Sequence, residues 1–159
     1  HPCYLCARMR RGYLYEYAQS LCCNKIALGH HFDDVIETIL MGMLYGAQMQ
    51  TMMPKLHSKS HPEMELIRPM YYVSEKDIIS WMNYNDLEFI KCACKITEKN
   101  APKDETGSKR QEIKKLIKEL KTKYDKIDKN IFMSAQNVNL DTLISYQKGG
   151  KKHHFLDEY

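Results

Sequence analysis

The sequence lacks long apolar runs. No stretch approaches the roughly eighteen consecutive apolar residues that a membrane-spanning helix requires. The first residues also show no basic segment followed by an apolar one, so no secretory signal is expected. We therefore expect a cytoplasmic protein without membrane contact. With 159 residues and 43% hydrophobic content, the chain is long enough for one domain with a core and too short for two full ones.

A large excess of charge is absent as well. The 24 Lys and Arg residues face 20 Asp and Glu residues, which leaves a formal net charge of +4. Any contact with nucleic acid must therefore come from local clustering of basic residues and not from the charge of the whole chain.

The six cysteines occur in three close pairs. These pairs are Cys3 with Cys6, Cys22 with Cys23, and Cys92 with Cys94. In a reducing cytosol they would stay thiols, so metal binding or catalysis is a better interpretation than a disulfide framework.

The first part of the chain reads as an α/β layer with a long surface loop over residues 47–64. The expected elements are helices over 7–21, 34–45 and 74–82 and short strands over 25–29 and 65–68. The strand at 25–29 is expected to be buried and parallel. Ser74, with Asp77 three residues on, is the expected cap of the third helix, which should bury Ile78, Ile79, Trp81 and Met82.

The rest of the chain reads as a linker and a helical region. Residues 95–107 are charged and small, which is typical of an exposed linker. Beyond them, a helix over 109–126 carries an apolar stripe, and a shorter helix is expected over 131–138. The stripe consists of Ile113, Leu116, Ile117, Leu120 and Tyr124. The basic tail over 148–154 is expected to be flexible.

The cysteines Cys3-x-x-Cys6 and Cys92-x-Cys94 form the first chemical constellation. Two thiolates in one turn can bind a metal, and a distant third or fourth ligand can complete a tetrahedral zinc site or an iron–sulfur cluster. The spacing does not choose between the two. A set of buried, reduced cysteines is the structural alternative.

A His-His-x-Asp-Asp cluster forms the second constellation. It follows the strand at 25–29 and opens a helix, so His30, Asp33 and Asp34 should face the carboxyl edge of the sheet, where open α/β folds bind ligands. Carboxylates there can hold Mg²⁺ on a polyphosphate, and an imidazole can contact a nucleotide. The structural alternative is helix capping by Asp34 with Glu37.

Basic residues form two further groups. Arg8, Arg10 and Arg11 follow the first cysteine pair, and Arg68 ends the second strand. Guanidinium groups in such places can neutralise phosphate or contact RNA, although a solvated helix face is the alternative. The lysines of the helix at 109–126 are most simply a solvated face.

Several segments together resemble one family, the tRNA 2-thiocytidine synthetases of the PP-loop ATP pyrophosphatase superfamily. The segment from Pro2 to Gly12 is similar to their Cys-x-x-Cys-x-x-x-Arg-Arg-Gly motif, and the segment from Lys25 to Thr38 continues the match in order. Shorter matching segments follow at Met43–Gly46, Met53–Leu56, Ile67–Pro69, Glu75–Ile78 and Met133–Val138. Colinear agreement over most of the chain is more specific than any single motif.

The resemblance implies a fold and a division of the chain. The fold would be α/β, the C-terminal part of a Rossmann-like parallel sheet of the adenine nucleotide alpha hydrolase type, followed by a C-terminal helical extension. Residues 1–94 would belong to the PP-loop ATPase domain with its cysteine motif. Residues 95–107 would be the linker, and residues 108–159 the extension.

The resemblance also implies a reaction: ATP adenylates the C2 oxygen of a tRNA pyrimidine, with cytidine favoured, and sulfur then displaces AMP. The implied site residues are Asp34 and Arg10 as catalytic groups, Gly29, His30 and Asp33 at the nucleotide, and Cys3, Cys6 and Cys92, with Cys94 as the alternative, as ligands of a [4Fe–4S] cluster. Zinc could replace the cluster in an aerobic preparation. The implied partners are tRNA, ATP with Mg²⁺, a cysteine desulfurase as sulfur donor, and a second copy in a homodimer.

Two features depart from the family pattern. The Ser-Gly-Gly-x-Asp-Ser loop is not found in the sequence, so we expect only the C-terminal part of the enzyme, without the PP-loop and inactive by itself. The second cysteine pair is Cys-x-Cys instead of Cys-x-x-Cys. Two other functions remain open: a non-catalytic RNA-binding module stabilised by zinc, and a metal-dependent phosphohydrolase built on His30, His31, Asp33 and Asp34.

Overall fold

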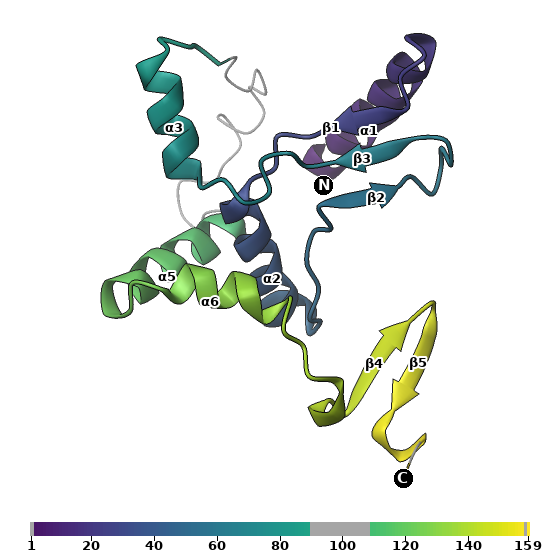
Figure 1. Cartoon of the computed structure of the whole chain (residues 1–159), viewed down its shortest axis with the longest axis vertical. Helices are drawn as coiled ribbons and strands as arrows, with labels where there is room; N and C mark the ends of the chain where they lie inside the picture. Colours follow the sequence, from purple (N-terminus) through teal and green to yellow (C-terminus); the bar gives the residue numbers. More distant parts are fainter. Residues whose placement is uncertain (1, 90–108, 158) are drawn as a thin grey trace.

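The computed structural model describes residues 2–89, 109–157 and 159, without the side chains of residues 2–4 and 7. Figure 1 shows helices and short strands following one another in the first half of the chain, then two helices and a hairpin. The elements of the first half are α1 (Pro2–Ser20), β1 (Lys25–Ala27), α2 (Phe32–Gly46), β2 (Lys55–His57), β3 (Glu65–Ile67) and α3 (Glu75–Tyr84). Those of the second half are α5 (Lys109–Lys123), α6 (Ile127–Ser134), β4 (Ser145–Lys148) and β5 (Lys151–His154), with short 3-10 turns at Leu140–Thr142 and Phe155–Asp157.

Strand β3 is the centre of a small mixed sheet. It pairs in parallel with β1, with Ile26 opposite Leu66, and antiparallel with β2, with Leu56 opposite the same residue. Helix α1 lies along this sheet (Figure 1). The expected α/β layer is therefore confirmed, but the expectation of a wholly parallel sheet is wrong, because β2 runs against its neighbour.

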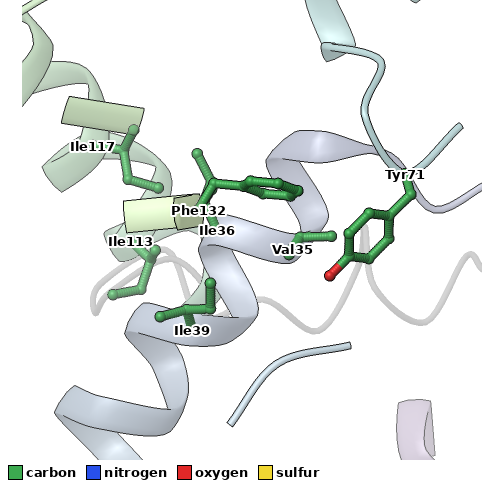
Figure 2. Close-up of a cluster of buried hydrophobic side chains, with 7 residues drawn as sticks. All are labelled: Val35, Ile36, Ile39, Tyr71, Ile113, Ile117 and Phe132. Carbon is green, nitrogen blue, oxygen red and sulfur yellow. The ribbon is translucent and has the colours of Figure 1, made fainter. Parts of the chain in front are cut away.

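The hydrophobic core lies where α5 and α6 pack against α2. Figure 2 shows α2 side chains meeting Ile113, Ile117 and Phe132 from the two later helices, with Tyr71 at one end. The stripe predicted on the helix at 109–126 is thus the buried face of α5, although Tyr124, its last member, is exposed. The α2 members of the cluster are Val35, Ile36 and Ile39.

Helix α2 is held at both ends by local contacts. At its start, the backbone N–H of His31 donates to Asp34 Oδ2 at 3.1 Å. At its end, Ala47 adopts the left-handed conformation, with φ of 47°, and donates its N–H to Gly42 O. Gly42 is required there, because a Cβ on it would lie 2.8 Å from Gln48 O. The capping box therefore uses Asp34 as an acceptor from His31, and does not pair Asp34 with Glu37.

Three strands were missing from the expected elements. Strand β2 lies inside the segment 47–64, which was expected to be a loop, and residues 148–154, expected to be flexible, belong to the hairpin β4–β5. The helix expected over 131–138 is α6, which begins four residues earlier and ends at Ser134. The expected linker at 95–107 lies outside the described residues.

The expected burial was also wrong at two elements. Strand β1 is half-buried at Ile26 and exposed at its ends, although a buried strand was expected. Helix α3 has the predicted Ser74 cap, which accepts from the N–H of Asp77 at 3.1 Å, yet it buries none of its residues. On α1, Leu14 and Tyr17 are exposed and Tyr15 is the buried side chain. Periodicity located these helices, but burial depends on which neighbour covers each face.

Within the part of the chain that the structure describes, no helix has the length and apolar character needed to cross a membrane. This agrees with the absence of long apolar runs in the sequence.

Truncation of Ile113 tests the contact between α2 and α5. Ile113 is fully buried, so Ile113→Ala should lower the free energy of unfolding by about 2–5 kcal/mol, measured by urea denaturation. Ile79→Ala is the matched control, because Ile79 is also helical but 47% exposed, and surface changes usually cost about 0.5 kcal/mol or less. Equal losses in the two variants would contradict the described core.

Candidate functional site

A cavity of about 210 Å³ lies between α1 and the parallel pair β1–β3. Arg10, Arg11 and His30 bring polar groups to it, and the rest of the lining is mainly apolar. The other lining residues are Leu14, Tyr15, Ile26, Leu28 and Leu66. The structure thus brings together two residues that the sequence predicted for the site, Arg10 on α1 and His30 after β1.

His30 and Arg68 follow the two parallel strands and meet at their shared carboxyl edge. Burial is the main cause that lowers the pKa of His30 below its ordinary value, and the positive charge of Arg68 lowers this pKa further. His30 Nδ1 is buried and has no hydrogen-bond partner within the described part of the protein. A neutral imidazole with a free ring nitrogen beside arginines can hydrogen-bond to a nucleotide or move a proton.

Arg68 is fixed by the segment that leads into β2. One guanidinium nitrogen, Nη1, donates to the carbonyl of Met53. The Nε atom is buried and has no partner among the described residues. Burial lowers the pKa of Arg68, and Arg11 nearby lowers it further, yet an arginine stays charged at neutral pH. The carboxyl edge of β1 and β3 is therefore electropositive, and Arg68 Nε is still available to donate a hydrogen bond.

The two predicted aspartates are engaged in contacts within the protein. Asp33 Oδ2 accepts from the backbone N–H of Glu75 at 2.6 Å, which joins the starts of α2 and α3. Asp34 accepts from His31 and lies 3.4 Å from Arg110 Nη1. Neither carboxylate lines the cavity described above. Gly29 follows β1 and is exposed.

A buried carboxylate, Glu37, lies one turn beyond Asp34. Its side chain is 2% exposed, 2.9 Å from Arg110 Nε and 3.7 Å from Lys114 Nζ. Burial raises the pKa of Glu37, and the two cations oppose that shift. Lys114 Nζ also lies 3.1 Å from Glu75 Oε1. Burial acts to lower the pKa of Lys114, but the hydrogen bond to Glu75 and the charge of Glu37 outweigh burial and raise that pKa. The network links α2, α3 and α5.

Sequence reasoning did not find this network. It treated Glu37 only as a capping residue and the basic side chains of α5 as a solvated face. The available signal was the spacing of Arg110 and Lys114, four residues apart and hence on one side of the helix that carries the Ile113 stripe.

Two of the cysteines predicted as cluster ligands lie in α1. Cys3 and Cys6 occupy positions three residues apart in α1, which places them on one side of that helix, and Cys6 is an exposed free thiol. This arrangement fits two ligands of one metal group. Cys92 and Cys94 lie outside the described residues. Cys22 and Cys23 are also exposed free thiols.

Within residues 2–89, 109–157 and 159, no group of three or more His, Cys, Asp or Glu side chains could hold a metal ion. The four residues invoked for a phosphohydrolase, His30, His31, Asp33 and Asp34, are among those described. Two of them pair with each other, since His31 Nε2 lies 3.4 Å from Asp34 Oδ2. A metal phosphohydrolase has no support in this geometry.

Comparisons with known proteins point in one direction. A family model described as the PP-loop domain matches residues 6–99. The tRNA-cytidine(32) 2-sulfurtransferase of Alcanivorax borkumensis is 36% identical over 98% of this chain and 56% of the relative. The enzymes of the same name from Photobacterium profundum and Coxiella burnetii are each 37% identical, over 86% and 91% of this chain and 43% and 54% of theirs. The chain therefore spans about half the length of the curated relatives it matches.

Among solved structures, the chain is similar to the U34-tRNA thiolase NcsA from Methanococcus maripaludis, which was solved with its [4Fe-4S] cluster. The TM-score is 0.62 with 20% identity, and the match covers 89% of this chain and 46% of that one. At this identity the likeness shows the fold alone.

One expectation needs correction. The chain was expected to hold only the C-terminal part of a PP-loop enzyme, with the PP-loop absent. That is wrong, because the PP-loop domain model matches residues 6–99 and the domain is present there. The expectation rested on one loop motif, whereas the family model matches a range that includes β1, α2 and β3.

The Glu37 network can be tested by a double-mutant cycle. Arg110→Met leaves the buried Glu37 carboxylate with Lys114 as its remaining cation, so the free energy of unfolding should fall by about 1–3 kcal/mol. In a Glu37→Gln background the same change should cost less, because no buried charge is then uncompensated. Urea denaturation should give a coupling energy of about 0.5–3 kcal/mol.

Lys118→Met, at an exposed position of α5, is the control and should show no coupling to Glu37. The pH dependence has a defined sign. Because burial raises the pKa of Glu37, the folded chain holds this proton to higher pH than the unfolded chain, and stability falls as pH rises through the raised pKa. Glu37→Gln should abolish that part of the dependence. Additive effects of Arg110→Met and Glu37→Gln would contradict the network.

Proposed function

Because the chain belongs to the PP-loop domain family, we propose that it is part of an ATP-dependent tRNA sulfurtransferase that acts on a cytidine. In the first step the C2 oxygen of the base attacks the α-phosphorus of ATP, and pyrophosphate leaves. In the second step a sulfur nucleophile adds to C2, and AMP leaves with the former base oxygen. The three sulfurtransferase relatives support cytidine as the substrate base.

The cavity at the carboxyl edge of β1 and β3 carries this proposal. Arg10 and Arg11 line it from α1, His30 lines it from the segment after β1, and Arg68 adds charge nearby. The adenylated intermediate and the departing AMP each carry a phosphate, which guanidinium groups stabilise by charge-assisted hydrogen bonds. A neutral His30 adds a group that can hydrogen-bond to the nucleotide without adding charge.

We assign roles within this edge. Arg10 stabilises negative charge on the transferring phosphate. Asp34 is the general acid or base that donates a proton to the cytosine ring or accepts one from it. Gly29, His30 and Asp33 border the nucleotide. Arg110 Nη1 lies 3.4 Å from Asp34 Oδ1 and places a positive charge beside that carboxylate. Mg²⁺ accompanies ATP as its counter-ion.

We further propose that Cys3, Cys6 and Cys92 hold a [4Fe–4S] cluster, with Cys94 as the alternative third ligand. Their support is the shared side of α1 on which positions 3 and 6 lie and the exposed thiol of Cys6. When bound, such a cluster supplies an iron site that can carry sulfur. A set of thiolates of this kind also binds zinc, which an aerobic preparation could contain.

The division into a catalytic region at residues 1–94, a linker at 95–107 and a C-terminal extension at 108–159 belongs to the same proposal. The extension contributes α5 and α6 to the core around α2, so its helices support the residues at the start of that helix. We propose tRNA and ATP as substrates, a cysteine desulfurase as the source of sulfur, and a homodimer as the assembly.

The test of this function is sulfur incorporation into tRNA by the full-length protein, purified without oxygen. With ATP, Mg²⁺, a sulfide or persulfide donor and unmodified tRNA, we expect 2-thiocytidine in the nuclease digest, detected by mass spectrometry. Asp34→Asn should lower the rate by about 100-fold or more, because loss of an acid–base group typically costs that much. Asp86→Asn, at an exposed turn with φ of 50° that Asn tolerates, should keep the wild-type rate.

Circular dichroism of Asp34→Asn should match the wild type, since Asn keeps an oxygen that can accept from His31. Absence of 2-thiocytidine with the wild-type protein would contradict the proposed reaction, and full activity of Asp34→Asn would contradict the role of Asp34.

Removal of one thiol tests the cluster. Cys6→Ala should abolish the iron content and the visible absorbance of the anaerobically prepared protein, because a three-cysteine site does not tolerate loss of a ligand. Cys23→Ala, which removes another exposed thiol close by in sequence, should retain both. Stoichiometric zinc without iron in the wild-type protein would instead favour a zinc-stabilised module.

A further inference from the structure

The hairpin formed by β4 and β5 is built for a tight reversal. Gly149 and Gly150 occupy its two-residue turn, and both have positive φ, 60° and 81°. A two-residue hairpin turn with positive φ at both positions is the type that matches the twist of the strands, and glycine adopts it without strain. The register is defined along its whole length, with Lys148 opposite Lys151 and Tyr146 opposite His153.

Positive charge is concentrated at the tip of this hairpin. Lys148, Lys151 and Lys152 are all exposed, and the sequence between Leu143 and Leu156 contains no Asp or Glu. Lysines directly opposite each other on neighbouring strands destabilise a hairpin. None of the ion pairs among the described residues involves these three lysines. The repulsion between these lysines lowers the stability of the hairpin, and no ion pair among the described residues offsets it.

One face of the hairpin combines two of these charges with aromatic rings. Side chains of directly opposed residues alternate between the two faces, so the pair Tyr146–His153 and the pair Lys148–Lys151 share a face. The rings of Tyr146 and His153 are stacked, with centroids 4.8 Å apart and planes 9° from parallel. A stacked pair of rings next to the ammonium groups of Lys148 and Lys151 suits a nucleotide chain, with a sugar or base against the rings and phosphates at the tip.

The hairpin stands apart from the rest of the chain. In Figure 1 it extends away from α2, α5 and α6, and the described hydrophobic core includes none of its residues. A two-stranded hairpin is marginally stable by itself in water. Its defined turn and register therefore serve something other than the core, and its charge indicates an anionic partner.

We propose that the β4–β5 hairpin is a contact site for the phosphate backbone of RNA, separate from the cavity at the sheet edge. The inference rests on the proposed function for its choice of tRNA as the RNA. An anionic membrane surface fits the hairpin less well, because the tip carries Gly149 and Gly150 between its lysines. The exposed apolar residues Ile144 and Phe155 lie at the opposite end.

The test compares two variants that each remove three positive charges. Lys148, Lys151 and Lys152 are changed to Gln in one, and the exposed α5 residues Lys115, Lys118 and Lys123 are changed to Gln in the other. Binding of the full-length protein to fluorescently labelled, unmodified tRNA is followed by anisotropy at several salt concentrations. Vesicles containing phosphatidylserine and an unrelated RNA of similar length serve as further probes.

We expect the hairpin variant to bind tRNA roughly tenfold more weakly or worse. The salt dependence of its affinity should fall by about one unit of slope for each phosphate that the protein no longer neutralises. The unrelated RNA should show the same weakening, because binding to phosphates carries no sequence information. The α5 variant should stay within about twofold of the wild type. Changing the three hairpin lysines to Arg should preserve binding and show that the charge is what matters.

Equal weakening in the hairpin and α5 variants would overturn the inference, because it would reflect the overall charge. Wild-type tRNA affinity in the hairpin variant would overturn it too, as would hairpin-dependent binding to vesicles without an effect on tRNA. Failure of the inference is separable from failure of the proposed function. If the wild type thiolates tRNA while the hairpin variant binds tRNA normally, only the hairpin role fails. If the hairpin variant loses tRNA affinity but the wild type incorporates no sulfur, only the reaction fails.

Discussion

The burial of Glu37 between α2 and α5 is the constraint on which most of this structure depends. A carboxylate with 2% exposure loses its hydration, and in proteins that penalty amounts to several kcal/mol unless cations and hydrogen bonds offset it. Arg110 and Lys114 provide this compensation from α5, a helix far along the sequence. The apolar contacts of Ile113 and Ile117 with α2 place these two cations correctly. Packing and ion pairing therefore require the same position of α5.

This constraint reaches the candidate site through Arg110. The same guanidinium that satisfies Glu37 lies 3.4 Å from Asp34, and Lys114 continues to Glu75 at the start of α3. Asp33, in turn, accepts from the backbone of Glu75. The starts of α2 and α3 are thus tied to each other and to α5. A displacement of α5 would therefore change the contacts of Asp34 more directly than those of the sheet.

Local patterns predicted the elements whose signals are local. The α5 stripe, the Ser74 cap and the position of His30 after a short strand all follow from residues close in sequence, and each is found in the structure. Strand β2 was not predicted, because its three residues lie in a segment rich in Met, Lys and Pro that shows no alternation of apolar and polar residues. The pair Gly149-Gly150 is a signal for a hairpin turn, but the basic residues around it led to the prediction of a flexible tail. The spacing of Arg110 and Lys114 places both on one side of α5, but their pairing with Glu37 joins residues distant in sequence, which no local pattern connects.

The size of the proposed substrate explains why positive charge lies in more than one place. A cavity of about 210 Å³ can hold part of a nucleotide, while a tRNA must be positioned by contacts outside it. Arg10, Arg11 and Arg68 concentrate charge where a phosphate would react, next to a neutral His30. The α5 cations nearest Asp34 are occupied by Glu37 and Glu75, so they are poorly placed to hold a distant part of the RNA. The hairpin lysines have no such partners among the described residues, and the hairpin extends away from the core, where a large nucleic acid can reach it (Figure 1).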